Sequence, residues 1–368
     1  MKSALIDHEK YKEKTVVGRY VSFSDIADFL NNLPKSVTKI QCGFSVLGAP
    51  IYSLTMGTGA TKILMWSQMH GNESTTTKAV LDALNYFLHN HEGQDVLSKC
   101  TIMVIPMLNP DGATSYTRVN ANKIDLNRDA QDLSQPESKV LRNVFEEFRP
   151  DFCFNLHDQR TIFSAGPHKK PATVSFLSPA ADQSRSVTAS RAKAMQVISV
   201  MNADLQKYIP NQVGRYDDGF NSNCVGDYFQ MQDVPTILFE AGHFPGDYGR
   251  ETTRFLIYKA LLCGVSAIVT NSFKEVKVGS YLLIPENEKL YVDVLVKNAH
   301  LINKELPEFT SVALQYEEQL VDGVLDFNLK IHEKGLTLPY FGHEEYDCAF
   351  SDKYQKLISC QSIVKLLL

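Results

Sequence analysis

The sequence predicts an α/β fold with helices on the faces of a sheet, followed by a small, mostly β C-terminal appendage. Over the first ~270 residues, short apolar runs alternate with segments of helical periodicity, which is typical of such a sheet. The run at residues 101–105 is apolar and ends at Pro106, as expected for a strand buried on both faces. After about Asn271 strand-like alternation replaces the helical pattern.

The elements of the first part follow one another in a regular order. Ser24 is placed to cap a short helix with apolar residues at 26, 29, 30 and 33. Ser134 as cap and Pro136 as first helical residue mark the start of another helix. Strands are predicted at 51–54, 62–67, 101–105, 152–156 and 234–239, and helices at 76–89, 136–148, 190–208 and 250–269.

In the appendage, strands are predicted at 281–284, 290–294, 312–320 and 324–331. The last two flank Asp322-Gly323, which is a strong hairpin signal. We therefore expect two domains, a large one over residues 1–272 and a small, mostly β accessory domain over 273–368.

The composition excludes several classes of protein. The 368 residues include 37 basic and 42 acidic side chains, a balance that argues against a nucleic-acid partner. Apolar residues make up 44%, enough for a sizeable core. No run of 18 apolar residues predicts a membrane span, and the N-terminus does not resemble a secretory signal. With seven cysteines and no CxxC pair, we expect reduced thiols and a cytoplasmic protein.

Three predicted strands end in residues that bind metals or transfer protons. The strand at 62–67 leads into His70 and Glu73, the strand at 152–156 into His157, and the strand at 234–239 into Glu240. Ligands of open α/β sheets bind outside the carboxyl ends of the strands. A hydrolytic zinc site uses three protein ligands, and two histidines with one glutamate are a known set. His70, Glu73 and His157 are thus candidate ligands, and Glu240 is left as a general base.

A group of anion-binding residues lies between these strand ends. Arg118 and Arg128 have no obvious helix partner in the sequence, and Asn127 precedes the second of them. Guanidinium groups beside a metal site suit the capture of a carboxylate. Each motif alone has an ordinary explanation, a chance His-x-x-Glu pair or surface arginines, and it is their joint placement that favours a site.

Together these residues resemble the zinc carboxypeptidase family, the carboxypeptidase A and B superfamily. The resemblance covers roughly residues 40–270 and rests on six separated elements in matching order. They are His70-Gly71-Asn72-Glu73, Asn109-Pro110-Asp111-Gly112, Arg118, Asp125-Leu126-Asn127-Arg128, His157 and Glu240. The resemblance implies a doubly wound mixed sheet of about eight strands, and one Zn²⁺ per chain on His70, Glu73 and His157.

The resemblance also implies roles for the other residues. Glu240 is the expected general base beside a metal-activated water, and Arg118 the group that polarises the scissile carbonyl. Asn127 and Arg128 are expected to hold the terminal carboxylate of a peptide. Tyr216 is the best match to a mobile tyrosine of the family. The implied activity is hydrolysis of the C-terminal peptide bond by a zinc metallocarboxypeptidase.

Three alternatives remain open from the sequence. The His70-Gly71-Asn72-Glu73 motif also resembles the succinylglutamate desuccinylase and aspartoacylase branch, which implies a deacylase of N-acyl amino acids. A second alternative is an amidopeptidase of cell-wall peptides. The third is a non-enzymatic module that binds carboxylates, against which the complete ligand set and intact Glu240 argue. The expected partner is accordingly a peptide or acylated amino acid with a free carboxylate.

Overall fold

The structure is a computed structural model that describes residues 2–368 and divides the chain into two compact units. The first unit runs to Gln159 and resumes over Ala172–Asn287. The second unit holds Arg160–Pro171 and Glu288–Leu368. Each unit has its own sheet, and the chain crosses between them three times.

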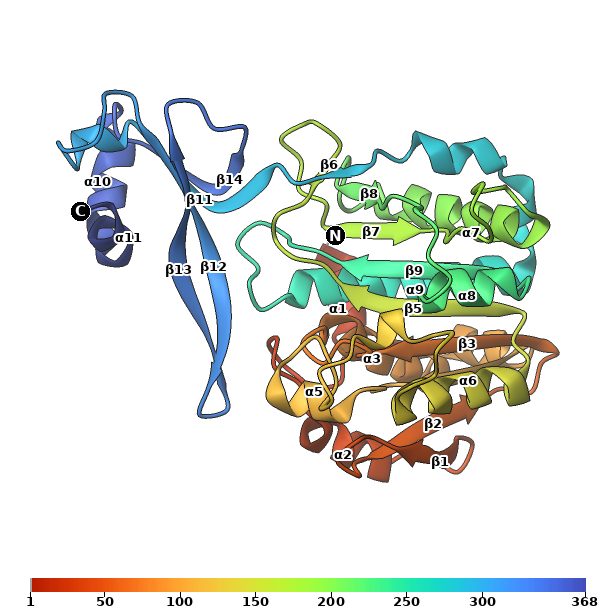
Figure 1. Ribbon diagram of the computed structural model, residues 1–368. Coiled ribbons are helices and arrows are strands. Elements are labelled where there is room, and N and C mark those ends of the chain that lie inside the picture. The colour runs from red at the N-terminus through yellow and green to blue at the C-terminus, as the bar shows by residue number, and fades with distance from the viewer. Residues whose placement is uncertain (1) are drawn as a thin grey trace. The chain divides into compact units, whose positions relative to one another are not determined.

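The first unit is built on one mixed sheet of eight strands (Figure 1). Its central strands β4, β3, β5 and β9 run parallel to one another, while β1, β2 and β7 introduce antiparallel pairs. This confirms the predicted α/β fold with a mixed sheet of about eight strands. In spatial order the strands are β1 (Thr38–Phe44), β2 (Pro50–Met56), β4 (Cys100–Ile105), β3 (Thr61–Ser67), β5 (Phe152–Asp158), β9 (Thr236–Ala241), β7 (Val174–Leu177) and β8 (Val213–Arg215).

Helices lie on both faces of this sheet (Figure 1). They are α1 (Lys2–His8), α2 (Phe23–Asn31), α3 (Thr75–His89), α4 (His91–Leu97), α5 (Pro110–Ser115), α6 (Pro136–Phe148), α7 (Ala189–Leu205), α8 (Val225–Met231) and α9 (Glu251–Thr270), with 3₁₀ turns η1 (Leu126–Arg128), η2 (Ser272–Glu275) and η3 (Val278–Leu283).

Alternate residues of the central strands supply two separate cores. On one face Met65 and Phe154 pack with α3, α7 and α9. On the other face Leu64, Trp66 and Cys153 pack with α6 and α8. Both faces of β5 are buried along its whole length, and its sequence is accordingly apolar except for Asn155 in the middle and His157 and Asp158 at the end.

Helix α9 is long and apolar enough to cross a membrane, judged by length and composition alone. In the structure most of it is buried inside the first unit, where Phe255, Leu256 and Leu261 are part of the core. A core helix that is covered on nearly all sides has the same composition as a spanning helix.

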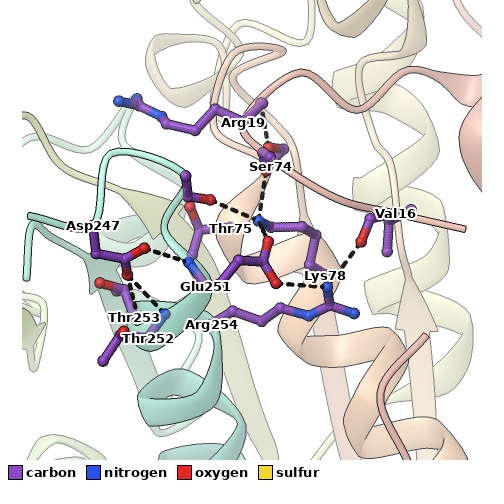
Figure 2. Close-up of polar contacts among 12 residues, drawn as sticks. Val16, Arg19, Ser74, Thr75, Lys78, Asp247, Glu251, Thr252, Thr253 and Arg254 are labelled. Atoms are coloured by element: carbon purple, nitrogen blue, oxygen red, sulfur yellow. Dashed lines mark hydrogen bonds and ion pairs between the residues drawn. The ribbon is translucent and has the colours of Figure 1, made fainter. Parts of the chain in front are cut away.

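A buried cluster of charges joins α3 to α9 (Figure 2). The guanidinium of Arg254 donates two hydrogen bonds of 2.7 Å to the carboxylate of Asp82, and both side chains are fully buried. Lys78, also fully buried, donates to Glu251 at 2.6 Å. Buried charges of this kind are tolerated only when each has a partner, so the cluster fixes how the two helices pack.

We expect Glu251→Gln to lower the melting temperature at pH 7, and the difference from wild type to disappear in acid. Burial alone would raise the pKa of Glu251, but Lys78 and Arg254 outweigh it and hold that pKa at about 2. A pKa below the ~4.3 of an unfolded chain stabilises the fold at higher pH. That contribution is lost as pH falls from ~4 through ~2. Melting temperatures measured across this pH range test the prediction. Glu275→Gln, at an exposed glutamate, is the control, and its melting temperature should stay close to that of the wild type.

The second unit contains a four-stranded sheet in the order β13-β12-β11-β14. Strands β12 and β13 form a long hairpin around Asp322-Gly323, both with positive φ, as the sequence predicted. Two C-terminal helices pack on the sheet through Leu357 and Ile363. The elements are β6 (Ser164–Ala165), β10 (Asn287–Glu288), β11 (Tyr291–Lys297), η4 (Ala299–Leu301), β12 (Ser311–Val321), β13 (Val324–Gly335), β14 (Phe341–Asp347), α10 (Ser351–Ser359) and α11 (Gln361–Leu367).

The two units divide the chain differently from the predicted boundary near residue 272. The predicted strand at 281–284 is wrong, because 278–283 form η3 and bury Tyr281 and Ile284 in the core of the first unit. Residues 160–171 belong to the second unit, where the Thr161 hydroxyl accepts a hydrogen bond from Gln315. The C-terminal helices were also not predicted.

Two predicted helix caps are wrong by one or two residues. Ser22, not Ser24, precedes α2, and its backbone N–H donates to the Asp25 carboxylate at 2.7 Å. Gln135, not Ser134, caps α6, although Pro136 is its first residue as predicted. Short polar residues cluster before both helices, and the sequence does not show which one adopts the capping conformation.

Candidate active site

Three adjacent parallel strands of the first unit carry the predicted catalytic residues to one edge of the sheet. Strand β3 leads into His70 and Glu73, β5 contains His157, and β9 contains Glu240. The strands lie in the order β3-β5-β9, and His157 and Glu240 are register partners. The parallel arrangement places the ends of all three strands together.

His70, Glu73 and His157 form a tight cluster. The ring nitrogen Nδ1 of His70 lies 2.9 Å from Glu73 Oε1, and His157 Nδ1 lies 2.8 Å from Glu73 Oε2. The two Nδ1 atoms are 3.1 Å apart. The ligand atoms of the three residues all lie within 4.8 Å of one another.

This donor set fits a zinc ion. Two imidazole nitrogens and a carboxylate are the ligands of many hydrolytic zinc sites, with the fourth position open to water or substrate. Both rings are buried and aim the same nitrogen, Nδ1, at the Glu73 carboxylate. Other divalent ions accept the same donors, and the choice of zinc follows from ligand type.

The protonation of the cluster differs from residue to residue. Burial would lower the pKa of His70, but Glu73 and Asp125 outweigh burial and raise it, so His70 gives up its proton to a metal less readily than the others. Burial disfavours the ionised form of Glu73, but His70 and His157 outweigh burial and lower the pKa of Glu73. Burial lowers the pKa of His157, which favours the neutral imidazole that a metal requires. Glu73 also accepts a hydrogen bond from the backbone N–H of Asp158 at 3.1 Å.

Asp125 contacts the candidate ligand His70, and this role was not predicted from the sequence. Its Oδ1 lies 2.9 Å from His70 Nε2, on the side of the ring away from Glu73. A carboxylate in this position fixes the tautomer and orientation of a ligating histidine. Asp125 also caps η1 by accepting from the backbone N–H of Asn127. The signal in the sequence was the position of Asp125 beside Asn127 and Arg128. Asp125 and His70 are 55 positions apart, so the sequence did not show that their side chains pair.

Asp158 is another residue whose role the sequence did not reveal. It follows His157 directly and accepts hydrogen bonds from the backbone N–H groups of Thr75 and Thr76 at the start of α3. These bonds tie the end of β5 to the helix that follows the His70–Glu73 loop. The two chain segments that supply the cluster are therefore held together by backbone amides as well as by side chains.

Glu240 lies in the same part of the sheet as the cluster but makes no bond to it. Burial raises the pKa of Glu240 well above its usual range, and the charges of Glu73 and Asp158 raise it further. Its Oε2 atom is buried and has no hydrogen-bond partner among the described residues. An unpaired buried carboxyl oxygen is costly and rare, and it is typical of a group kept for chemistry.

The two predicted arginines and Asn127 lie on the chain between β4 and α6. Arg118, whose side chain is 49% exposed, contacts Glu73 Oε1 at 3.3 Å and Asp125 Oδ2 at 3.1 Å. Asn127 Oδ1 accepts from the backbone N–H of Val225 at 3.0 Å, and Arg128 is exposed beside it. Arg118 is thus in direct contact with the cluster, and Arg128 is not.

Tyr216 follows β8 and is electrostatically linked to the site. Burial raises the pKa of the Tyr216 phenol, and the charges of Glu240 and Glu73 raise it further. Its backbone N–H donates to Phe176 of β7, the strand next to β9. The structure therefore places this predicted tyrosine within the field of both carboxylates.

Comparisons with known proteins agree with this geometry. A family model described as zinc carboxypeptidase matches residues 24–224, a stretch that includes the His70–Glu73–His157 cluster and ends before Glu240. Carboxypeptidase 2 of Trichophyton rubrum is 30% identical over 111 residues, which are 29% of this chain and 21% of the relative. Carboxypeptidase SOL1 of Arabidopsis thaliana is 26% identical over 162 residues, covering 38% of this chain and 33% of the relative. The matches thus span about a fifth to a third of the length of these relatives.

Solved structures share the fold. A metallo-carboxypeptidase from Burkholderia cenocepacia superposes with a TM-score of 0.54 at 18% identity, covering 69% of this chain and 70% of that one. Carboxypeptidase A from Helicoverpa armigera gives 0.56 at 18% identity, covering 73% and 81%. The family model matches more than half of the chain, so this chain belongs to the zinc carboxypeptidase family.

Proposed function

We propose that this protein is a zinc-dependent metallocarboxypeptidase that removes the C-terminal residue of a peptide. One observation carries the proposal. His157 of the buried His-Glu-His cluster is the register partner of Glu240 on the neighbouring strand, and the Oε2 atom of Glu240 is buried without a hydrogen-bond partner among the described residues. This combination supplies a metal site and a separate proton-transfer group at one edge of the sheet.

His70, Glu73 and His157 are the residues that would hold the zinc ion. When bound, zinc acts as a Lewis acid that polarises a carbonyl group and lowers the pKa of water. The protein's own contribution is to hold the ligands in place. Asp125 orients the His70 ring, and the backbone N–H of Asp158 orients the Glu73 carboxylate.

Glu240 carries the proton in this proposal. Its carboxylate takes a proton from the attacking water and later delivers it to the nitrogen of the leaving amino acid. A raised pKa suits both steps, because a general acid–base works best when its pKa is near the operating pH. The buried Oε2 atom has no other bond that would compete for that proton.

The arginines recognise and stabilise negative charge. Arg118, next to the cluster, is placed to stabilise the oxyanion that forms on the scissile carbonyl. Asn127 and Arg128, held by η1, are proposed to bind the terminal carboxylate of the peptide. Tyr216, a half-buried residue that follows β8, is proposed to contact the substrate from that side.

Arg128→Gln should lower kcat/KM for a peptide with a free C-terminus by about 10–100-fold, the effect of one hydrogen bond to a charged group. The same variant should change cleavage of the C-terminally amidated peptide by less than about threefold, since the amide offers no carboxylate. Steady-state kinetics on the two peptides measure the difference. Arg149→Gln, an exposed arginine at the end of α6, is the control. An equal decrease in kcat/KM for the free and the amidated peptide would exclude Arg128 as the carboxylate-binding residue.

The deacylase alternative is favoured by one feature, the His70-Gly71-Asn72-Glu73 motif. A mass-spectrometric screen of zinc-loaded protein against peptides, N-acyl amino acids and cell-wall peptides decides between these activities. Release of single C-terminal residues from peptides supports the proposal. Cleavage confined to acyl amino acids or cell-wall peptides would replace it, and binding without cleavage of any substrate would favour the non-enzymatic carboxylate-binding module.

A further inference from the structure

The chain segment before α2 runs along the first unit and is held by buried side chains. We call residues 13–21 the N-terminal strap. Its two valines, Val16 and Val21, are buried in the core. Five of its backbone carbonyls accept hydrogen bonds from side chains of other elements: Glu13 and Val16 from Arg254, Gly18 from Lys78, Arg19 from Ser74, and Val21 from Gln68.

One part of the strap is anchored to α3 and α9. Arg254 and Lys78 reach it from the buried charge cluster that joins these helices (Figure 2). Both cations are fully buried and also paired with Asp82 or Glu251, so their positions are fixed. Figure 2 shows Arg254 reaching the carbonyl of Val16 while it contacts Glu251. The strap is therefore attached to α3 and α9 by side chains that are themselves paired.

The other part of the strap is bound by the loop that carries two metal ligands. Residues 68–74 connect β3 to α3 and contain His70 and Glu73. At one end of this loop Gln68 Nε2 donates to the Val21 carbonyl at 2.6 Å. At the other end Ser74 Oγ donates to the Arg19 carbonyl at 2.5 Å. The strap thus contacts the ligand loop on both sides of His70 and Glu73.

Gln68 is unusual in its backbone as well as its side chain. It is fully buried and has a φ of 48°, a left-handed conformation that residues other than glycine seldom adopt. Its Nε2 also donates to the Gly71 carbonyl at 2.9 Å, and its Oε1 accepts from Thr77 Oγ1 at 2.9 Å. Every polar atom of this amide is used, and one amide group links the strap, the ligand loop and α3.

Gly71 shows how closely the loop is packed. A Cβ atom placed on Gly71 would lie 1.9 Å from the backbone of Gly112 in α5, so the two backbones are too close for any side chain at this position. Gln68 holds the same peptide from the carbonyl side. The backbone between His70 and Glu73 is therefore confined by α5 and by the Gln68 amide.

We propose that Gln68 is a positioning residue for the metal site, which ties the ligand loop to the N-terminal strap. The strap precedes residue 24, where the zinc carboxypeptidase match begins, so the scaffold of the ligand loop includes chain outside that match. Left-handed backbone held in place by side-chain bonds is typical of sites that keep ligands in a fixed geometry. This inference rests on the proposed zinc site.

The test is the zinc affinity of the 368-residue chain, measured by competition with a chromogenic chelator, together with the melting temperature of the zinc-free form. Gln68→Gly keeps the left-handed backbone without strain but removes the amide. We expect its zinc affinity, measured below the melting temperature of the zinc-free variant, to fall about 10–100-fold, as for the loss of other groups that hold metal ligands in place. The melting temperature of the zinc-free variant should fall too, because the buried carbonyls of Val21 and Gly71 lose their donor. The matched control is Gln196→Ala, which removes a similar glutamine–carbonyl bond in α7 and should leave zinc affinity unchanged.

Two outcomes would overturn the inference in distinguishable ways. Wild-type protein that binds no zinc would remove the proposed metal site itself. If the wild type binds zinc and Gln68→Gly binds it with the same affinity, the Gln68 amide does not position the metal ligands. If Gln68→Gly does not fold, Ser74→Ala removes the other strap bond and is judged by the same affinity measurement, with severalfold weaker binding expected and wild-type affinity overturning the inference.

Discussion

Glu240→Gln is expected to lower kcat for peptide hydrolysis by about 10²–10⁴-fold while leaving zinc affinity unchanged, because the amide can neither accept nor deliver the proton. Glutamine has nearly the same shape as glutamate, so the packing of β9 against β5 should persist. Glu240 makes no bond to His70, Glu73 or His157, so the metal site should be intact. Single-turnover kinetics with a zinc assay on the same sample separate the two properties.

The pH dependence of the wild type gives an independent check. If Glu240 must be ionised to accept a proton, kcat/KM should rise with pH through its pKa, and this acid limb should be absent from the residual activity of Glu240→Gln. The exposed Glu305→Gln in the second unit is the control and should retain full activity. Wild-type turnover by Glu240→Gln would refute its role in proton transfer.

Much of the first unit could be predicted because its sequence signals are local. The strands at 62–67 and 152–156 are apolar runs flanked by turns, and each corresponds to a strand of the sheet. When two such strands are parallel neighbours, the residues just beyond them meet at one edge of the sheet. The proximity of His70 and His157 could therefore be anticipated from the polar residues that follow the two strands, once the strands were taken as parallel.

Other features depend on contacts between distant residues and have no local signal. The pairing of Asp125 with His70 spans 55 residues and is made by a loop without regular periodicity. The left-handed backbone of Gln68 follows from bonds to Val21 and Gly71, not from an intrinsic preference of glutamine. In each case tertiary contacts decide a conformation that local propensity does not favour.

The second unit shows the same limit at a larger scale. The continuous apolar run at 281–284 was expected to form a strand, yet residues 278–283 form a 3₁₀ turn, and Tyr281 and Ile284 are buried in the core of the first unit. Residues 160–171 leave the first unit directly after Gln159, and their short strand β6 pairs with β10, more than a hundred residues later in the chain. A discontinuous unit of this kind has no boundary that composition can reveal.

His157→Ala should abolish zinc binding at concentrations that saturate the wild type. His157 is the one member of the cluster supplied by β5, and its Nδ1 lies within 3.1 Å of ligand atoms from both other residues. Removing it leaves one imidazole and one carboxylate, which is too few ligands for a stable zinc site. The loss of zinc affinity should therefore exceed the ~10–100-fold typical of residues that only hydrogen-bond a metal ligand. The rate of hydrolysis should fall to that of the zinc-free protein.

The same substitution separates metal binding from folding. The His157 ring is buried between His70 and Glu73, so its loss also leaves a small cavity and removes a hydrogen bond from Glu73. Melting of the zinc-free variant shows how much stability this costs, and the added stabilisation by zinc, present in the wild type, should be absent. His91→Ala, at a histidine whose side chain is 88% exposed, should show wild-type stabilisation by zinc. A His157→Ala protein that is stabilised by zinc as much as the wild type would show that the ion binds elsewhere.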